Sequence, residues 1–134
     1  MELGNIETNN FSCVTEEDIH LEKIDGNARN VILRTTRNIY MREKVDGNSS
    51  AKIEAGGSIS IGQKVDGSSE VDLKAGGDIT ILQKIDGHST VTLECAGKIS
   101  IGQKVDGASV VRWRAADAHW GYQGIKGGSE VTRF

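Results

Sequence analysis

The chain has 134 residues, including 17 Gly and no Pro, with 4% aromatic residues and a formal net charge of −3. This length is enough for one domain with its own core, and the lack of Pro suits a backbone whose N–H groups are nearly all needed as sheet donors. No basic tail or stripe is present, so the composition argues against nucleic acid or an anionic membrane as the main partner.

The first segment, MELGNIETNN, contains no basic stretch followed by an apolar run, so we expect no signal peptide. No long apolar stretch occurs, so we expect no transmembrane helix and no membrane insertion. Cys13 and Cys95 fit no metal-binding or redox spacing, and we expect no cofactor. These features leave the localisation open.

A repeat of about 20 residues organises the chain. The tripeptide IDG or VDG recurs at a nearly constant interval, and a degenerate copy, IKG, continues the series. Only the first interval differs, because it is longer by one residue. The Gly residues of these tripeptides are Gly26, Gly47, Gly67, Gly87, Gly107 and Gly127. Within a unit, apolar or small residues alternate with polar residues or Gly, as in Ile59–Ser60–Ile61 and Val71–Asp72–Leu73. Alternation with period two is typical of β-strands.

Three arrangements could use this pattern. In a solenoid each unit is one coil, and equivalent residues stack ~4.8 Å apart along the axis. A meander of hairpins would need a cover for its apolar face, and no segment is predicted to be helical. A membrane barrel would need aromatic girdles, which this sequence lacks. We therefore predict an all-β, single-domain β-solenoid, a right-handed parallel β-helix of about six coils, with a closed soluble barrel as the alternative.

In chain order, residues 1–17 are predicted to form an N-terminal partial coil or cap, because Phe11 and Cys13 have the same phase as Val71 and Leu73. Residues 18–118 form five repeat coils. The first of them drops one residue after Leu21 and gains one before Val31. Residues 119–134 form a degenerate final coil or C-terminal cap, since the ends of repeat arrays are commonly atypical.

Two corners per coil are predicted, one at the GG or AG step after Ala55, Ala75 and Cys95, and one at the DGxS step, where Asp caps its own turn and Gly takes a positive φ. The apolar phase should fill the core, and stacking of neighbouring coils should provide the stability. Ile81→Asp should therefore be severely destabilising, and unchanged thermal stability would disprove the inward assignment.

The segments AGGDITI and AGGSISI resemble the Gly–Asp punctuated strands of bacterial haemagglutinin-type adhesin repeats. A small chain of six short regular coils also resembles the bactofilins, bacterial cytoskeletal β-solenoids. Both resemblances cover roughly residues 18–118 and lie in architecture and punctuation, while the QK[IV]DG step belongs to neither pattern. A bactofilin-like protein would assemble end to end, whereas an adhesin-like one would be a fragment of a longer surface rod.

One Asp and one Lys recur two positions apart in each unit. Stacked Asp carboxylates could hold Ca²⁺, but each coil offers only one, so we expect turn capping and charge pairing rather than calcium binding. The Asp residues are Asp25, Asp46, Asp66, Asp86 and Asp106, and the Lys residues are Lys23, Lys44, Lys64, Lys84 and Lys104.

Other recurring polar residues also have structural interpretations. Gln63, Gln83, Gln103 and Gln123 share the inward phase and are predicted to form an amide ladder. The three His residues cannot converge on a metal, Ser recurs only at a corner, and no Ser/His/Asp arrangement is present, so we expect no catalytic site. A column of His20, Tyr40, Ser60, Thr80, Ser100 and Trp120 is too mixed to bind ice.

The C-terminal segment, residues 112–134, departs most from the repeat. Trp113 has an inward phase and is predicted to plug the core, whereas Trp120 and Tyr122 are predicted to point outward. Aromatic residues together with Arg are typical interface anchors, and a cap that closes the last coil is the alternative. The candidate interface residues are Arg112, Arg114, Trp120, Tyr122 and Phe134.

Open strand edges at a solenoid end invite pairing with another chain. Glu16, Glu17 and Asp18 are predicted to protect the N-terminal end from such pairing, and the C-terminal end has no comparable run of charges. We therefore expect a non-catalytic structural or protein-interaction module that self-associates. The expected partner is a second copy of the chain, in a homo-oligomer, or another protein. The alternative is a binding protein, such as a surface adhesin fragment or an inhibitor or immunity-type partner.

Overall fold

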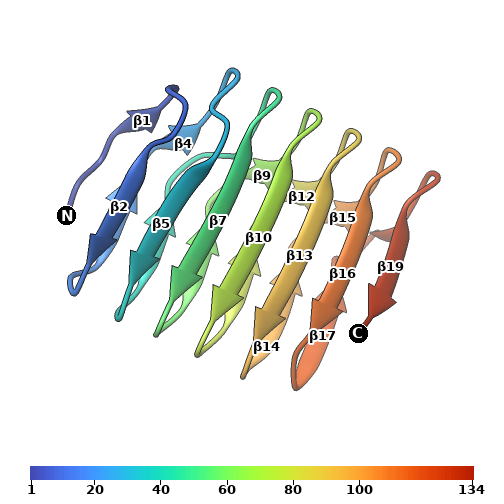
Figure 1. Ribbon diagram of the computed structural model, residues 1–134. Coiled ribbons are helices and arrows are strands. Elements are labelled where there is room, and N and C mark those ends of the chain that lie inside the picture. Colours follow the sequence, from blue (N-terminus) through green and yellow to red (C-terminus); the bar gives the residue numbers. More distant parts are fainter.

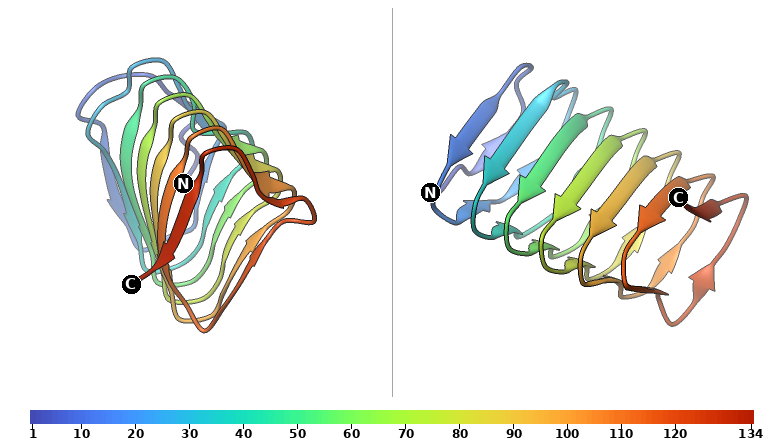
Figure 2. Two further views of the ribbon diagram at one scale, coloured as in Figure 1. Left: turned by 90° about the vertical axis from the view of Figure 1, so that its right-hand side faces the viewer. Right: turned by 60° about the horizontal axis from the view of Figure 1, so that its bottom comes forward.

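The computed structural model describes all 134 residues and contains strands but no helix. All strand pairs are parallel, and the chain winds as a β-solenoid of about six turns, as predicted (Figure 1). Seen from the C-terminal end in Figure 2, left, the chain descends along one sheet, rises along a second and returns over a third as it approaches the viewer, so the winding is right-handed. The open, stacked sheets exclude a hairpin meander and a closed barrel.

The largest sheet has seven strands and forms one side of the solenoid. Its strands are β2 (Ser12–Thr15), β5 (Val31–Thr35), β7 (Ser50–Ala55), β10 (Glu70–Ala75), β13 (Thr90–Cys95), β16 (Val110–Arg114) and β19 (Glu130–Arg133). A six-stranded sheet forms the second side. Its strands are β3 (Ile19–Leu21), β6 (Ile39–Met41), β8 (Ile59–Ile61), β11 (Ile79–Ile81), β14 (Lys98–Ile101) and β17 (Asp117–Trp120).

Two-residue strands form the third side, which we call the short sheet. A four-stranded part contains β9 (Lys64–Val65), β12 (Lys84–Ile85), β15 (Lys104–Val105) and β18 (Gly124–Ile125), and a two-stranded part contains β1 (Asn5–Ile6) and β4 (Lys23–Ile24). Isolated bridges from Ile24 to Val45 and from Val45 to Val65 join the two parts. A coil therefore has three unequal sides, with three corners rather than the two that were predicted.

The third corner lies between the six-stranded and short sheets, at Gly62–Gln63 and its equivalents. The prediction missed it because the alternation Ile61–Gln63–Val65 continues through the bend without a Gly–Gly or Asp–Gly step. The predicted Gln ladder is also wrong. The Gln backbones stack, with the Gln83 N–H donating to the Gln63 carbonyl at 2.9 Å, but the side chains lie half-buried or exposed at the corner and make no hydrogen bond with one another.

The inward phase forms the core, as the alternation predicted. Thirty buried hydrophobic residues make one continuous cluster, because each inward side chain stacks on its equivalent in the next coil. Ile81, for example, lies between Ile61 and Ile101, and all three are fully buried. Burying an aliphatic side chain contributes about 1.5–3 kcal/mol, so each coil is stabilised by its neighbours.

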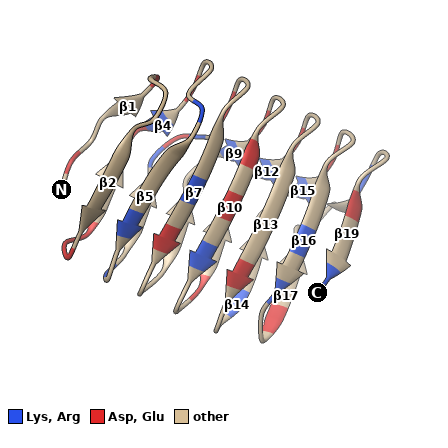
Figure 3. Cartoon of the chain, viewed as in Figure 1, with Lys and Arg blue, Asp and Glu red and all other residues tan.

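The outer face of the seven-stranded sheet carries charges that alternate in sign from coil to coil (Figure 3). Register pairing places Arg34, Glu54, Lys74, Glu94 and Arg114 in one column. Arg34 and Glu54 form an ion pair at 3.6 Å. Opposite charges on neighbouring strands contribute roughly 0.2–1 kcal/mol each, so this column favours the observed register.

The N-terminal segment forms most of one coil. Glu2 bridges to His20 on the six-stranded sheet, β1 pairs with β4, and β2 pairs with β5. The irregular first repeat is confirmed, because Leu21 pairs with Met41, Ile24 bridges to Val45 and Val31 pairs with Ala51. A bulge precedes Val31 at Asn30, whose φ is +59°.

The structure contains no helix that is long and apolar enough to cross a lipid bilayer.

Candidate functional site

The Asp–Gly corner is a repeated hydrogen-bonded unit. In the coil that contains Asp66, the Gly67 N–H donates to the Asp66 carboxylate at 2.7 Å, and the Ser69 hydroxyl donates to the Asp66 carbonyl at 2.8 Å. Lys64 pairs with the same carboxylate at 2.9 Å. The same contacts recur with Asp46, Asp86 and Asp106, which confirms turn capping and charge pairing.

These contacts shift the pKa values of the acidic groups. Burial raises the pKa of Asp66, but the Lys64 ammonium and the Gly67 N–H outweigh it, so that the pKa lies below its ordinary value. At Asp106 the pKa is lowered first by Lys104 and then by the Gly107 N–H. Each of these carboxylates thus has close partners within its own coil. No group of three or more His, Cys, Asp or Glu side chains is placed to hold a metal ion.

The final coil has a different register from the one predicted. Ile101 pairs with Trp120 and Ser100 pairs with His119, one position short of the repeat period. The last coil is one residue shorter at the corner between β16 and β17. It gains one residue before β18, where Lys104 pairs with Gly124 at the full repeat spacing. Gly121 and Gly124 both have positive φ in this compensating bend. Trp120 therefore points inward, and the prediction that it lies on the outward phase was wrong.

Trp113 and Trp120 close part of the core together. Trp113 follows Leu93 in an inward column, as predicted, and its ring meets the Trp120 ring edge to face at 5.6 Å between centroids. Arg133 stacks over Trp113, with its guanidinium carbon 5.1 Å from the ring centroid. The same Arg donates to the Ala115 carbonyl at 3.3 Å. These contacts lie within the chain and favour the interpretation of this segment as a cap that closes the last coil.

The predicted interface residues fall into separate groups. Phe134 lies beside both Arg112 and Arg114, whose guanidinium carbons are 5.2 and 5.4 Å from its ring centroid, on the outer face of the seven-stranded sheet. Trp120 belongs to the end of the core instead. Tyr122 lies in the bend between the six-stranded and short sheets and is 74% exposed. The candidate interface residues, although near in sequence, thus do not form one patch.

The C-terminal end exposes part of the core that the sequence analysis did not identify. Ile125 extends the column of Ile24, Val45, Val65, Ile85 and Val105. Those five side chains are all 0% exposed, whereas Ile125 is 47% exposed. Val131 and Trp120 are only partly buried against the same core. The inward phase of the IKG copy was the signal that could have identified Ile125.

The N-terminal end is more completely closed. Ile6 is the member of the Ile125 column in the first coil and is only 2% exposed. Leu3, Phe11 and Cys13 pack against the core and are partly buried. Residues 1–18 carry five acidic side chains and no Lys or Arg.

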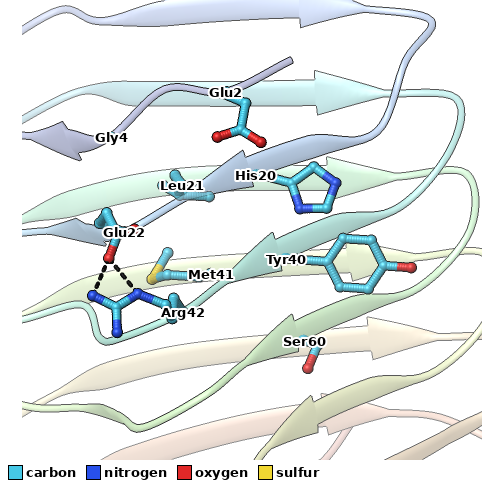
Figure 4. Close-up of a pocket in the computed structure, with 9 residues that line it drawn as sticks. All are labelled: Glu2, Gly4, His20, Leu21, Glu22, Tyr40, Met41, Arg42 and Ser60. Atoms are coloured by element: carbon cyan, nitrogen blue, oxygen red, sulfur yellow. Dashed lines mark hydrogen bonds and ion pairs between the residues drawn. The ribbon is translucent and has the colours of Figure 1, made fainter.

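A concavity of about 490 Å³ lies near this end, on the outer face of β3 and β6 (Figure 4). The rings of His20 and Tyr40 stack at 5.0 Å on one side of it. Glu22 and Arg42 form an ion pair on the other side, and this contact raises the pKa of Arg42 and lowers that of Glu22. Equivalent positions in later coils carry Ser60, Thr80 and Ser100, so the aromatic wall is confined to β3 and β6.

Comparisons with protein-family models, curated proteins and solved structures found no match. The resemblance to bactofilins and adhesin repeats therefore extends to the β-solenoid architecture alone.

Proposed function

We propose that this protein is a non-catalytic structural or interaction module that self-associates through the C-terminal end of its solenoid. The observation that carries the proposal is the exposure of Ile125, in a column whose next five members are fully buried. A side chain in that position resembles a core residue that lacks its covering coil. Burial of Ile125, Trp120 and Val131 by another chain would remove apolar surface from water, the main driving force of association.

The strand edges support the same site. The N–H groups of Glu130 and Phe134 donate to Ser109 and Trp113, both at 2.9 Å. Backbone groups of alternate residues point to opposite sides of a strand, so the N–H groups of Val131 and Arg133 point to the open edge. An open edge beside exposed apolar side chains is a template for pairing with another chain.

The test is the molar mass of the full chain by light scattering after size exclusion, over a hundredfold range of concentration. We expect a mass that rises with concentration, and a monomer for Ile125→Asp. Leu82→Asp is the matched control, because Leu82 is an apolar side chain that is 56% exposed on the lateral surface. A monomeric wild type at every concentration, or equal loss of assembly in both variants, would overturn the proposal.

The second candidate function is that of a binding protein, such as an adhesin fragment or an inhibitor-type partner. The concavity between the His20–Tyr40 stack and the Glu22–Arg42 pair favours it, because the site combines an aromatic wall with charged groups. If this function is correct, Tyr40→Ala and Arg42→Ala should abolish capture of a partner, while Ile125→Asp should leave it unchanged. Equal capture by all three variants would contradict it.

A further inference from the structure

We infer that the C-terminal end of one copy binds the N-terminal end of a second copy, head to tail, so that the solenoid continues across the junction. This inference rests on the proposed self-association and specifies its partner surface. The strands, the columns and the charges of the two ends each support it.

The strand edges of the two ends match in length on two of the three sides when the copies are stacked head to tail. β19 has four residues and would meet β2, which also has four. β18 and β1 both have two residues. Residue Glu2, already bridged to the six-stranded sheet, would meet β17. All three sides of the solenoid can therefore pair at once, with the same parallel geometry as inside the molecule.

The unpaired backbone groups also alternate in the required way. The Ile32 N–H donates to the Phe11 carbonyl at 2.8 Å, so the N–H groups of Ser12 and Val14 point to the open N-terminal edge. At the other end those of Val131 and Arg133 point outward. This is the arrangement by which every internal pair of strands on this sheet is bonded.

A symmetric contact between two C-terminal ends matches less well. In such a contact a two-fold axis lies perpendicular to the solenoid axis and reverses one copy. If the seven-stranded sheets of the two copies then meet each other, the six-stranded sheet of each copy meets the short sheet of the other. β17 has four residues and β18 has two. The edges of two sides would then be mismatched, whereas the head-to-tail contact leaves only the side of Glu2 and β17 unequal in length.

The columns place one pair of opposite charges and one pair of complementary hydrogen-bonding groups at the head-to-tail junction. Ile6 and Ile125 belong to one column, so the residues that follow them, Glu7 and Lys126, both belong to the column of the repeat Asp residues. At the junction the Lys126 side chain of one copy therefore lies next to the Glu7 side chain of the other. His119 lies in the column of Ser100, and Glu2 bridges to His20 in the same column, so these two also become neighbours. Lys126, Glu7, His119 and Glu2 are all exposed in the single chain.

Net charge favours the same pairing. Residues 1–18 carry five acidic side chains and no basic one, whereas residues 112–134 carry four Lys or Arg and two acidic side chains. A head-to-tail contact brings the acidic end to the basic end, while contacts between like ends oppose like charges. A head-to-tail contact uses a different surface on each copy, so each added copy leaves one free end. Unless the rotation between copies completes a ring, the result is an open series of oligomers.

The experiment blocks one end at a time. Val14→Pro removes an N–H that points to the open N-terminal edge, and Ile125→Asp places a carboxylate on the C-terminal end. We expect each variant alone to be monomeric and their mixture to form a 1:1 heterodimer, because each retains one competent end. Val14→Thr, which keeps the N–H, should assemble like the wild type.

The alternatives have different outcomes. If Val14→Pro still forms homodimers and Ile125→Asp does not join it, the C-terminal ends bind each other, which overturns the head-to-tail inference but leaves the proposed self-association intact. A wild type that never associates overturns both. If Val14→Pro does not fold, the charge pair provides a second test. Glu7→Lys and Lys126→Glu should each weaken assembly by about three- to tenfold, and the double variant should recover it; no recovery would overturn the inference.

Discussion

The first and last coils are built on the same columns but end the core differently. Ile6 and Ile125 occupy the same column, yet the first is 2% and the second 47% exposed. The first coil has acidic side chains without basic ones, and the last carries an excess of basic side chains. A repeat protein of this kind thus has two ends that are not equivalent, and the difference gives the molecule a polarity.

The difference arises from local changes in the repeat. The last coil loses a residue before β17, which turns Trp120 inward beside Trp113 and fills the core near the seven-stranded and six-stranded sheets. The short sheet receives no comparable cover, and Ile125 stays open. In the first coil, Leu3 and Phe11 pack against the core from both sides of Ile6 in the sequence.

The largest expected effect separates the interior of the core from its C-terminal end. Ile85→Asp places an unpaired charge in a fully buried position and should destabilise the fold by more than about 4 kcal/mol, as should Ile81→Asp. Ile125→Asp in the same column as Ile85 should cost less than about 1 kcal/mol, because water reaches the new carboxylate. Urea unfolding followed by circular dichroism measures both, and similar losses of stability would contradict the comparison.

The next effect concerns Gly in the Asp–Gly corner. Gly87 has φ +71°, and an added Cβ would clash with the Gly67 carbonyl oxygen. Gly26, the first member of the column, has φ +66° but nothing within 4 Å of an added Cβ. Gly26→Ala should therefore cost only about 1–2 kcal/mol, the cost of the left-handed conformation, and Gly87→Ala clearly more. Thermal unfolding of the two variants tests this, and a larger loss for Gly26→Ala would disprove it.

A smaller effect is expected at the buried Ser column. Ser89 is fully buried and donates to the Asp86 carbonyl at 2.8 Å, so Ser89→Ala should cost about 1–2 kcal/mol. Ser129 in the last coil is the equivalent residue, but its hydroxyl has no hydrogen-bond partner. Ser129→Ala should thus be neutral or slightly stabilising. Chemical denaturation is sensitive enough to separate the two, and equal losses would mean that the last corner is formed like the others.

The smallest effect is the dependence of stability on pH. The pKa values of Asp25, Asp46, Asp66 and Asp106 are lower in the folded chain than their ordinary values. Their contribution to stability is therefore complete above the ordinary Asp pKa of about 4 and is lost as the pH falls through the lowered values. The melting temperature should fall as the pH drops from about 5 to about 3, and less so in Asp66→Asn. The last coil has Lys126 in place of the repeat Asp, so it contributes nothing to the loss of stability at low pH. A pH profile of Asp66→Asn identical to that of the wild type would contradict this account.

Much of the fold could be predicted from the repeat itself. The regular period and the alternation within it are enough to place Ile81, Val91 and Leu93 in the core, because both depend only on local strand geometry and on identical stacking from coil to coil. The capping of Asp66 by Gly67 is equally local. The corner at Gln63 was missed because nothing in the alternation marks the bend.

The sequence by itself determined the strand phase and the capped Asp–Gly corners, since both are encoded by neighbouring residues and repeated in register. It also determined the irregular first repeat, because the regular copies that follow reveal where that unit departs from the period. Only the tertiary structure decided that Trp120 points inward, because a residue deleted at one corner and regained at the next changes the phase between them without a local signal. It also decided which end of the core is covered. That outcome depends on how Leu3, Phe11, Trp113 and Arg133 pack across coils, which is a property of the three-sided stack and not of any single repeat.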